Sequence, residues 1–281
     1  MINSDKIIIS SPCRIHIAPL PGHIHDDRAF AYSLAIAIQV PRILMKNSKL
    51  TIIPKEINVK NKGVGAGISE TITILIHEQL YKESKININD ILSRIKVPMY
   101  RGIDILTLLY GGLILGSEVL CDDVVKYLIP ITRCTVDLGF ILYIPAGRIR
   151  KERIVIDEEI NILMFKDVLK IINGALLNDF TLFIEGLRNI EQYLQYLRAR
   201  TYGSRYLWDS AEELENYIKN KYNISILCQS GSGPTLYTPL RSFNQALTLC
   251  RKLKEDLESK FDIHILACRS DNMGLRIKVY S

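Results

Sequence analysis

A cluster of glycines in the first third of the chain has the composition of an anion-binding loop. It runs from Gly63 to Gly67 (GVGAG), and apolar residues at helical spacing follow it from Ile68 to Leu80. Glycine allows backbone N–H groups to approach a ligand closely, and a helix directs the positive end of its dipole at the same place. A flexible turn between a strand and a helix explains the glycines equally well. The predicted phosphate-binding residues of this loop are Gly63, Gly65, Ala66, Gly67 and Ser69.

A second glycine turn lies near the other end of the chain, in the segment Gln229 to Thr235 (QSGSGPT) between two predicted strands. Two glycines and two hydroxyls in a tight turn can surround a phosphate or hold another loop in place. The alternative is a hairpin connection, although an ordinary one is shorter and does not need both serines. The predicted phosphate-binding residues of this turn are Ser230, Gly231, Ser232 and Gly233.

Two charged residues in mainly apolar surroundings are the candidate catalytic residues. Arg14 lies on an early predicted strand, where it could face a phosphate or only cover a sheet edge, and His16 on the same face is expected to be structural. Asp104 lies in the apolar segment RGIDILTLLYGG, where a carboxylate is costly to bury unless it is paired. Asp104 could accept a proton from a substrate hydroxyl, or it could be a first-turn residue stabilised by the helix dipole.

Two other clusters have structural explanations that we prefer. The segment His23 to Arg28 (HIHDDR) could bind a divalent ion, but adjacent ligands seldom converge, so a solvated turn is favoured and no metal site is predicted. Tyrosines and arginines alternate between residues 193 and 206, as on a stacking platform for single-stranded nucleic acid, but a helix core with extended arginines is preferred. These residues are Tyr193, Tyr196, Arg198, Arg200, Tyr202, Arg205 and Tyr206.

The composition limits the class of protein. The 281 residues are 48% hydrophobic and 23% charged, which predicts a folded chain of two lobes. The net charge of +6 is spread without basic blocks, which suits small anionic ligands at least as well as nucleic acid, and a nucleic-acid partner is not expected. Six widely spaced cysteines without a C-x-x-C pair are expected to be reduced thiols. No export signal or spanning stretch is visible, so a cytoplasmic protein that crosses no membrane is predicted.

Hydrophobic patterning predicts an α+β protein with lobes at residues 1–135 and 136–281. Strands are expected at 7–9, 14–17, 32–40 and 50–53, with Pro19, Pro21, Pro41 and Pro54 at their ends. Helices are expected after the glycine cluster, at 103–109, 160–173 and 181–198, and a strand at 140–144. The tail has the order strand, strand, helix, strand, strand, which is typical of a helix-covered antiparallel sheet. Its elements are strands at 224–228, 235–238, 263–267 and 276–279 and a helix capped by Ser242.

Four segments in sequence order resemble the GHMP kinase superfamily. SPCRIHI resembles its first motif, GVGAGIS its second and QSGSGPTLY its third, while Asp104 ahead of Gly111 and Gly112 matches the segment that carries the catalytic Asp of the kinases. The resemblance implies a two-lobed fold with a ribosomal S5-like N-terminal lobe and a ferredoxin-like C-terminal lobe. It also implies a small phosphorylated substrate and Mg²⁺, and it leaves open whether the chain forms a homodimer.

Within the superfamily, the chain is most similar to archaeal β-ribofuranosylaminobenzene 5'-phosphate synthases. The similarity rests on the SPxRIH opening, VPRI, GFILYIPAGR, NIEQYLQYL, QSGSGPTLY and DNMGLRI. It implies a transferase that joins phosphoribosyl pyrophosphate to a hydroxy- or aminobenzoate in methanopterin-type cofactor synthesis. Two family segments, an Asp-Gly-Gly and a His-Ser-Phe-Gly, are replaced by the sequences around His25 to Ala31 and Ser117 to Asp123.

The alternatives follow from these departures. Asp104 stands where the synthase usually has glycine and the kinases have their catalytic Asp, so an ATP-dependent small-molecule kinase with Asp104 as base is the second hypothesis. A non-catalytic relative that binds a ligand or RNA is the third.

Overall fold

The computed structural model describes residues 7–25, 28–46, 49–53, 63–83, 86–95, 97, 101–121, 124–146 and 158–279. The chain divides into two compact units. The first contains residues 1–60, 65–133 and 271–281, and the second contains residues 61–64 and 134–270. Two continuous lobes were expected from the sequence. The structure differs from that expectation because residues 61–64 group with the second unit and the last eleven residues group with the first.

The first unit is built on a six-stranded sheet with the order β10-β1-β2-β4-β5, in which β3 also pairs with β2. Antiparallel pairing joins β1 to β10, β1 to β2, and β2 to β3 and β4. The elements of this unit are β1 (Ile7–His25), β2 (Arg28–Lys46), β3 (Lys49–Ile53), α1 (Ala66–Glu83), α2 (Ile88–Ile95), α3 (Gly102–Tyr110), β4 (Leu113–Cys121), β5 (Val124–Cys134) and β10 (Arg276–Val279).

Pro19, Pro21 and Pro41 do not end their strands, contrary to the prediction, whereas β3 does end at Ile53, the residue before Pro54. β1 continues through Pro19 and Pro21 to His25, and β2 continues through Pro41. Beyond Ser10, β1 has no pairing with β10 in the described sheet, so this side of β1 is an open edge. A proline is tolerated there because no neighbouring strand needs the N–H that proline lacks. Register shifts mark β-bulges near these positions, which bend a strand without ending it.

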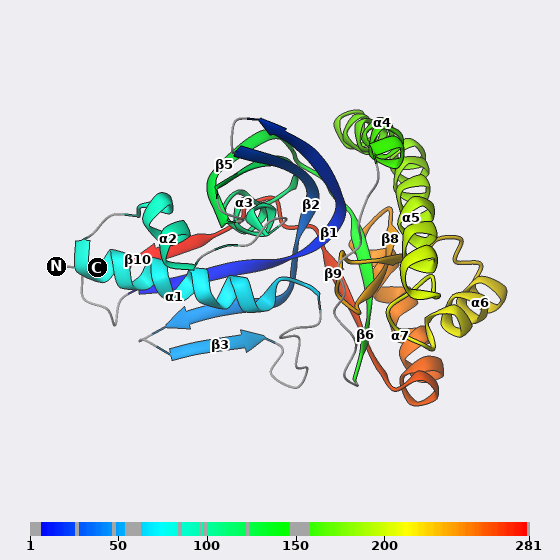
Figure 1. Ribbon diagram of the computed structural model, residues 1–281. Helices are drawn as coiled ribbons and strands as arrows, with labels where there is room; N and C mark the ends of the chain where they lie inside the picture. Colours follow the sequence, from blue (N-terminus) through cyan, green and yellow to red (C-terminus); the bar gives the residue numbers. More distant parts are fainter. Residues whose placement is uncertain are drawn as a thin grey trace. The chain divides into compact units, whose positions relative to one another are not determined.

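Helices α1 and α3 cover one face of the sheet and close the core of the first unit. Figure 1 shows α1 running along β1 and α3 lying inside the curl of the strands. The contact is apolar because α1 contributes Ile72 and Ile76 and α3 contributes Ile105 and Leu108, all fully buried with Ile9 of β1. Burial of side chains of this size contributes about 1.5–3 kcal/mol each. The rigid end of α1 thereby fixes the position of the glycine loop that precedes it.

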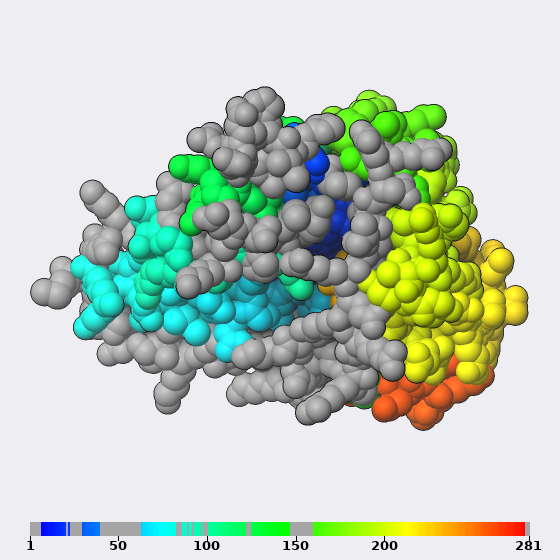
Figure 2. All heavy atoms as spheres, in the orientation of Figure 1, coloured from blue at the N-terminus to red at the C-terminus, as the bar shows by residue number. Residues whose placement is uncertain are grey.

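The second unit contains a four-stranded antiparallel sheet with the order β7-β8-β6-β9. Its core joins the sheet to α6 and α7 through residues such as Tyr143, Leu214, Leu236 and Leu253. Helices α4 and α5 form an antiparallel pair that reaches the surface (Figure 2). The elements are β6 (Gly139–Pro145), α4 (Glu158–Leu176), α5 (Phe180–Tyr202), α6 (Ala211–Tyr222), β7 (Cys228–Gln229), β8 (Leu236–Leu240), α7 (Phe243–Phe261) and β9 (Ile263–Arg269).

Helix ends follow the capping residues in the sequence. The Asp179 side chain accepts hydrogen bonds from the amides of Thr181 and Leu182 and begins α5, which ends at Gly203 in the left-handed conformation. The predicted cap of α7 is confirmed, because the Ser242 hydroxyl accepts a hydrogen bond from the Gln245 amide.

Two elements of the predicted C-terminal tail differ in the structure. The strand expected at 224–228 is reduced to β7, which pairs with β8 at Cys228 and Gln229. The last strand, β10, pairs with β1 in the first unit instead of completing the sheet of the second. The cause is local: the Asp271 amide donates to Ala37 O at 2.8 Å, and the Gly112 amide donates to Asp271 O at 2.6 Å, which anchors the final segment to the first sheet.

The predicted α+β fold class is confirmed, with one sheet and its helices in each unit. The six cysteines are all free, five of them buried and Cys121 partly exposed, as predicted. Among the described residues, no helix is both long enough and apolar enough to cross a membrane.

Candidate glycine-loop anion site

The first glycine of the loop is held by the second glycine turn, and both belong to the second unit. The Ser230 hydroxyl donates to the carbonyl oxygen of Gly63 at 2.8 Å, across 167 positions of sequence. Gly63 has a positive φ of 89°, and a Cβ built on it would lie 2.6 Å from Gly233 Cα. Glycine is therefore required at this position both by conformation and by the close approach of the two backbones. The two motifs predicted separately from sequence meet here.

The turn that holds Gly63 is itself fixed by hydrogen bonds. The Ser230 amide donates to Thr235 O at 2.9 Å, and the Gly233 amide donates to Ser230 O at 3.1 Å. Gly231 has a positive φ of 58°. Ser230 is almost fully buried, while Ser232 is partly exposed. Ser230 therefore supports the loop, and Ser232 is the hydroxyl of the turn that solvent can reach.

The helix end of the loop, which belongs to the first unit, lies against Arg14. A Cβ on Gly65 would lie 3.0 Å from Arg14 Cγ and 3.3 Å from Nε, and φ at Gly65 is 73°. Arg14 is 3% exposed and forms a two-point ion pair with Asp104, in which Nε donates to Oδ1 and Nη2 donates to Oδ2 at 2.9 Å. Arg101 also reaches Asp104 Oδ2, at 3.4 Å, with its side chain 39% exposed. Arg14 and Arg101 thus share the Asp104 carboxylate beside the loop.

The surroundings of Asp104 favour a positioning role over a role as base. Burial raises the pKa of Asp104, but the charge and hydrogen bonds of Arg14, together with electrostatic interactions with Arg101 and His16, outweigh it, so the pKa lies below its ordinary value. A carboxylate with a low pKa and both oxygens occupied accepts a proton poorly. Burial, together with the Arg14 charge, lowers the pKa of His16 to about 3, so His16 stays neutral, as expected of a structural histidine.

The start of α1 offers amides to a ligand. Within the part of the chain that the structure describes, no acceptor is found for the N–H groups of Gly65, Ala66 and Gly67. Ser69, which was predicted to bind phosphate, is fully buried instead, with its hydroxyl bonded to Ser11 Oγ at 2.7 Å and Pro12 O at 2.9 Å. Its contact is with β1, so Ser69 fixes the start of α1 against that strand.

Gly67 is a glycine for which neither conformation nor contact with the described residues gives a reason. It lies in α1 without a positive φ, and a Cβ on it would meet no atom of the described part of the chain within 4 Å. Glycine in a helix costs about 0.5–1 kcal/mol relative to alanine. Close approach of a ligand is a physical reason for a glycine at this position.

Gly67→Ala therefore separates folding from ligand binding. We expect the melting temperature to be unchanged or raised, because alanine favours the helix by up to about 1 kcal/mol. We expect pyrophosphate to bind about tenfold more weakly, a loss of about 1.4 kcal/mol, because the added methyl group occupies the surface of the loop. Calorimetric titration beside thermal unfolding measures both quantities. Unchanged affinity would mean that no ligand approaches Gly67.

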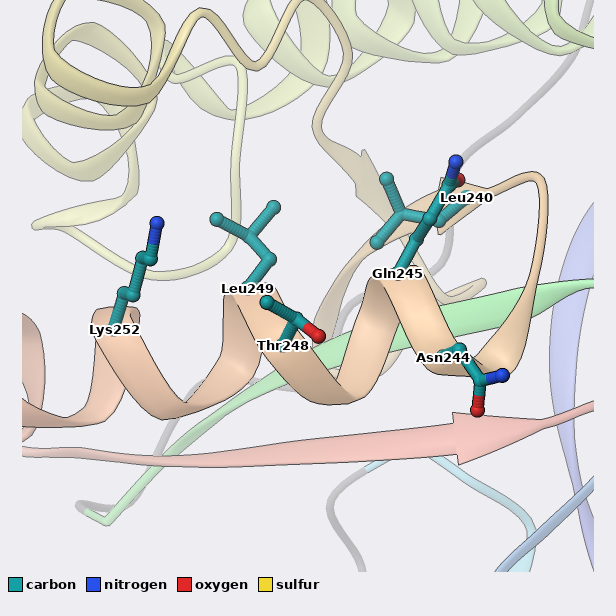
Figure 3. Close-up of a pocket in the computed structure, with 6 residues that line it drawn as sticks. All are labelled: Leu240, Asn244, Gln245, Thr248, Leu249 and Lys252. Atoms are coloured by element: carbon teal, nitrogen blue, oxygen red, sulfur yellow. The ribbon is translucent and has the colours of Figure 1, made fainter.

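The tyrosine-arginine cluster is partly buried. Arg198 and Tyr206 are buried and Arg205 pairs with Glu212 and Glu215, so these three residues are held by other groups, whereas Tyr196 is 58% exposed. Asp26 and Asp27 of the HIHDDR segment lie outside the described residues, as do the other side chains of that segment. No group of three or more potential metal-binding side chains occurs among the residues that were described. A shallow depression on α7 (Figure 3) contains neither glycine motif. It is lined by Leu240, Asn244, Gln245, Thr248, Leu249 and Lys252.

Sequence reasoning missed Arg101 and the acidic residues that hold the site. Arg101 precedes Asp104 by three residues, a spacing that places two side chains on one helix face and that could have indicated the pair. Glu118 accepts a hydrogen bond from the Ile103 amide at 3.0 Å and so caps α3, a contact between distant segments that no local pattern indicates.

The fold is shared with solved small-molecule kinases and a decarboxylase. Homoserine kinase from Cytophaga hutchinsonii aligns over 99% of this chain and 98% of its own, with a TM-score of 0.63 and 13% identity. Mevalonate-3-kinase from Thermoplasma acidophilum aligns over 98% and 99%, with a TM-score of 0.56 and 11% identity. Mevalonate diphosphate decarboxylase from Staphylococcus aureus aligns over 96% and 98%, with a TM-score of 0.53 and 10% identity.

No protein-family model matches the sequence, and no curated protein matches it. The structural similarity covers nearly all of each chain. It therefore confirms that this chain has the two-lobed α+β fold of GHMP kinases.

Proposed function

We propose that this chain is a transferase of the GHMP superfamily that binds the phosphate groups of a donor substrate at the loop from Gly63 to Gly67. The observation that carries the proposal is the hydrogen bond from Ser230 to Gly63, which joins the two glycine motifs. Such a contact is expected of a loop whose backbone must be held ready for a ligand. The amides at the start of α1 and the positive end of its dipole supply the attraction for an anion.

ATP is the donor that we favour. Two of the proteins with the same fold are kinases, and mevalonate-3-kinase has a solved structure with ADP bound. Phosphoryl transfer depends mainly on positioning and charge neutralisation. Arg14 and the loop amides offer these, whereas the paired Asp104 is a poor base. We therefore assign Asp104 the role of orienting Arg14.

Mg²⁺ fits this proposal as a companion of the donor phosphates. It commonly binds through phosphates, water and one or two carboxylates instead of a cage of protein ligands. No such cage of His, Cys, Asp or Glu side chains occurs within the described ranges. When bound, the ion would neutralise phosphate charge.

The second candidate is transfer from phosphoribosyl pyrophosphate to a hydroxy- or aminobenzoate. The segments that resemble the synthases favour it, and several of them form the site or its supports: SPCRIHI carries Arg14, QSGSGPTLY carries Ser230, and DNMGLRI returns the chain to the first sheet. Pyrophosphate is common to both donors, so the same loop suits either one.

The test is a titration of the full-length protein followed by a turnover assay. ATP, ADP, phosphoribosyl pyrophosphate and pyrophosphate, each with Mg²⁺, are compared by thermal shift, because a ligand that binds only the native state raises its stability. We expect ATP and pyrophosphate to raise the melting temperature. Release of labelled carbon dioxide from phosphoribosyl pyrophosphate and labelled 4-hydroxybenzoate would favour the second candidate. Binding without turnover of any acceptor would indicate a non-catalytic relative, and no binding of any phosphate ligand would remove the proposal.

A further inference from the structure

A buried ion pair on α5 lies outside the groups assigned so far. Arg198 is 0% exposed and Glu191 is 5% exposed, and the two lie seven residues apart on one face of the helix, about two turns. Nη2 of Arg198 donates to Oε1 of Glu191, and Nε donates to the Leu194 carbonyl at 3.2 Å. The guanidinium also lies over the ring of Tyr206, 5.7 Å from its centroid. The pair is therefore enclosed within the second unit.

The free oxygen of this carboxylate is directed to the glycine turn. Glu191 Oε2 accepts a hydrogen bond from the Gln229 amide at 3.2 Å, immediately before Ser230. The Gln229 side chain continues the network, because Oε1 accepts from the Leu207 amide at 3.1 Å and Nε2 donates to Gly231 O at 3.2 Å. Helix α5, the segment that follows it and the turn are thus joined through one glutamine.

The energetics of the pair point away from a role in stability. Burial raises the pKa of Glu191 despite Arg198 and the Gln229 amide, so the charged form is held against a desolvation penalty. Nη1 of Arg198 is buried with no hydrogen-bond partner among the described residues, which adds a further penalty. Well-packed apolar residues in place of such a pair are often neutral or stabilising. Because the pair costs stability, its benefit lies elsewhere. Its hydrogen bond to the turn indicates that the benefit is a fixed position of that turn.

We propose that Glu191, Arg198 and Gln229 are positioning residues. They place the turn so that the Ser230 hydroxyl can donate its hydrogen bond to Gly63 O, and anion binding at the loop depends on this placement. The proposal rests on the proposed function, since it concerns the same loop. The three residues act through backbone placement and do not themselves contact the anion.

The first test compares two glutamine substitutions in the full-length protein. Gln229→Met removes both side-chain hydrogen bonds to the turn and its neighbour with little change in volume. Gln195→Met is the matched control, because Gln195 donates to the Tyr206 hydroxyl at 2.8 Å and hydrogen-bonds to Glu191 in the same network, but has no hydrogen bond to the turn among the described residues. We expect pyrophosphate to bind roughly tenfold or more weakly to the Gln229 variant and almost normally to the control.

A second variant separates positioning from stability. The double substitution Glu191→Met with Arg198→Met removes the charges and their penalty together, so thermal stability is expected to be unchanged or higher. Pyrophosphate affinity is expected to fall roughly tenfold all the same, because the Gln229 amide loses its acceptor. A positioning role would be contradicted if pyrophosphate affinity fell only in those variants that also lost thermal stability.

The outcomes can be told apart by calorimetric titration with pyrophosphate. Wild-type protein that fails to bind overturns the proposed function and this inference with it. Wild-type protein that binds, with unchanged affinity in both the Gln229 variant and the double variant, overturns this inference alone. Normal binding in the wild type and the control, with weak binding in the Gln229 and double variants, supports both.

Discussion

Asp104→Asn is expected to destabilise the protein by about 3–5 kcal/mol, because it breaks the two-point ion pair with the buried Arg14 guanidinium. Arg14 is 3% exposed and Asp104 is fully buried, so water cannot replace the lost partner. Anion binding should fall as well, since the asparagine no longer holds Arg14 beside Gly65 through two charged bonds. Denaturant unfolding and pyrophosphate titration measure the two effects.

The double variant Arg14→Met with Asp104→Leu provides the control. Removal of both charges should recover most of the stability, because the desolvation penalty of the pair disappears with the pair. Anion affinity should not recover, because Arg14 is absent. Full recovery of affinity would show that Arg14 plays no part in the site.

The pH dependence of stability follows from the same pair. The pKa of Asp104 is lowered in the folded protein, so this group stabilises the fold above its unfolded pKa of about 3.9 and loses the contribution as pH falls through the folded value. Wild-type protein should therefore lose more stability below that pH than Asp104→Asn, which has no proton to gain. Parallel slopes for the two proteins in acid would contradict this account of the pair.

Gly63→Ala is expected to destabilise the protein by about 2–5 kcal/mol, the sum of a left-handed backbone penalty and overpacking. The added Cβ would lie 2.6 Å from Gly233 Cα and 3.2 Å from Gly233 C, both backbone atoms that cannot rotate aside. The loop and the turn must separate, so pyrophosphate binding should be lost with the hydrogen bond from Ser230. Unfolding and titration measure the two losses.

Gly203→Ala is the matched control for this change. Gly203 has a similar positive φ of 75°, but a Cβ on it would meet no atom within 4 Å among the residues that the structure describes. It should cost only the backbone penalty of about 1–2 kcal/mol and leave anion affinity intact. Equal effects of the two substitutions would show that contact between loop and turn has no special importance.

The parts of the site that the sequence predicted are those encoded by local patterns. Glycines at Gly63, Gly65 and Gly231 all adopt positive φ, and the apolar spacing after Gly67 does form a helix. The long helices α4 and α5 also follow their predicted spans, because amphipathic periodicity and a capping Asp179 define them.

The parts that could not be predicted depend on contacts between distant segments. The patterning of Arg276 to Val279 indicates a strand, but its partner is chosen by Asp271 bonds to Ala37 and Gly112. The sequence indicated that a buried Asp104 needs a partner. It did not indicate that the partner is Arg14, because the two residues lie 90 positions apart. The same applies to Glu191 and Gln229, since nothing in α5 indicates that its carboxylate bonds to a turn 38 residues later.

The central claim is that the amides at the start of α1 bind an anion, and amide NMR of the isotopically labelled protein tests it most directly. Addition of pyrophosphate should shift and protect the N–H signals of Gly65, Ala66 and Gly67, while the amide of Gly203, another glycine in the left-handed region, stays unchanged. Saturating pyrophosphate that leaves these three signals in place, or that shifts residues elsewhere alone, would contradict the account.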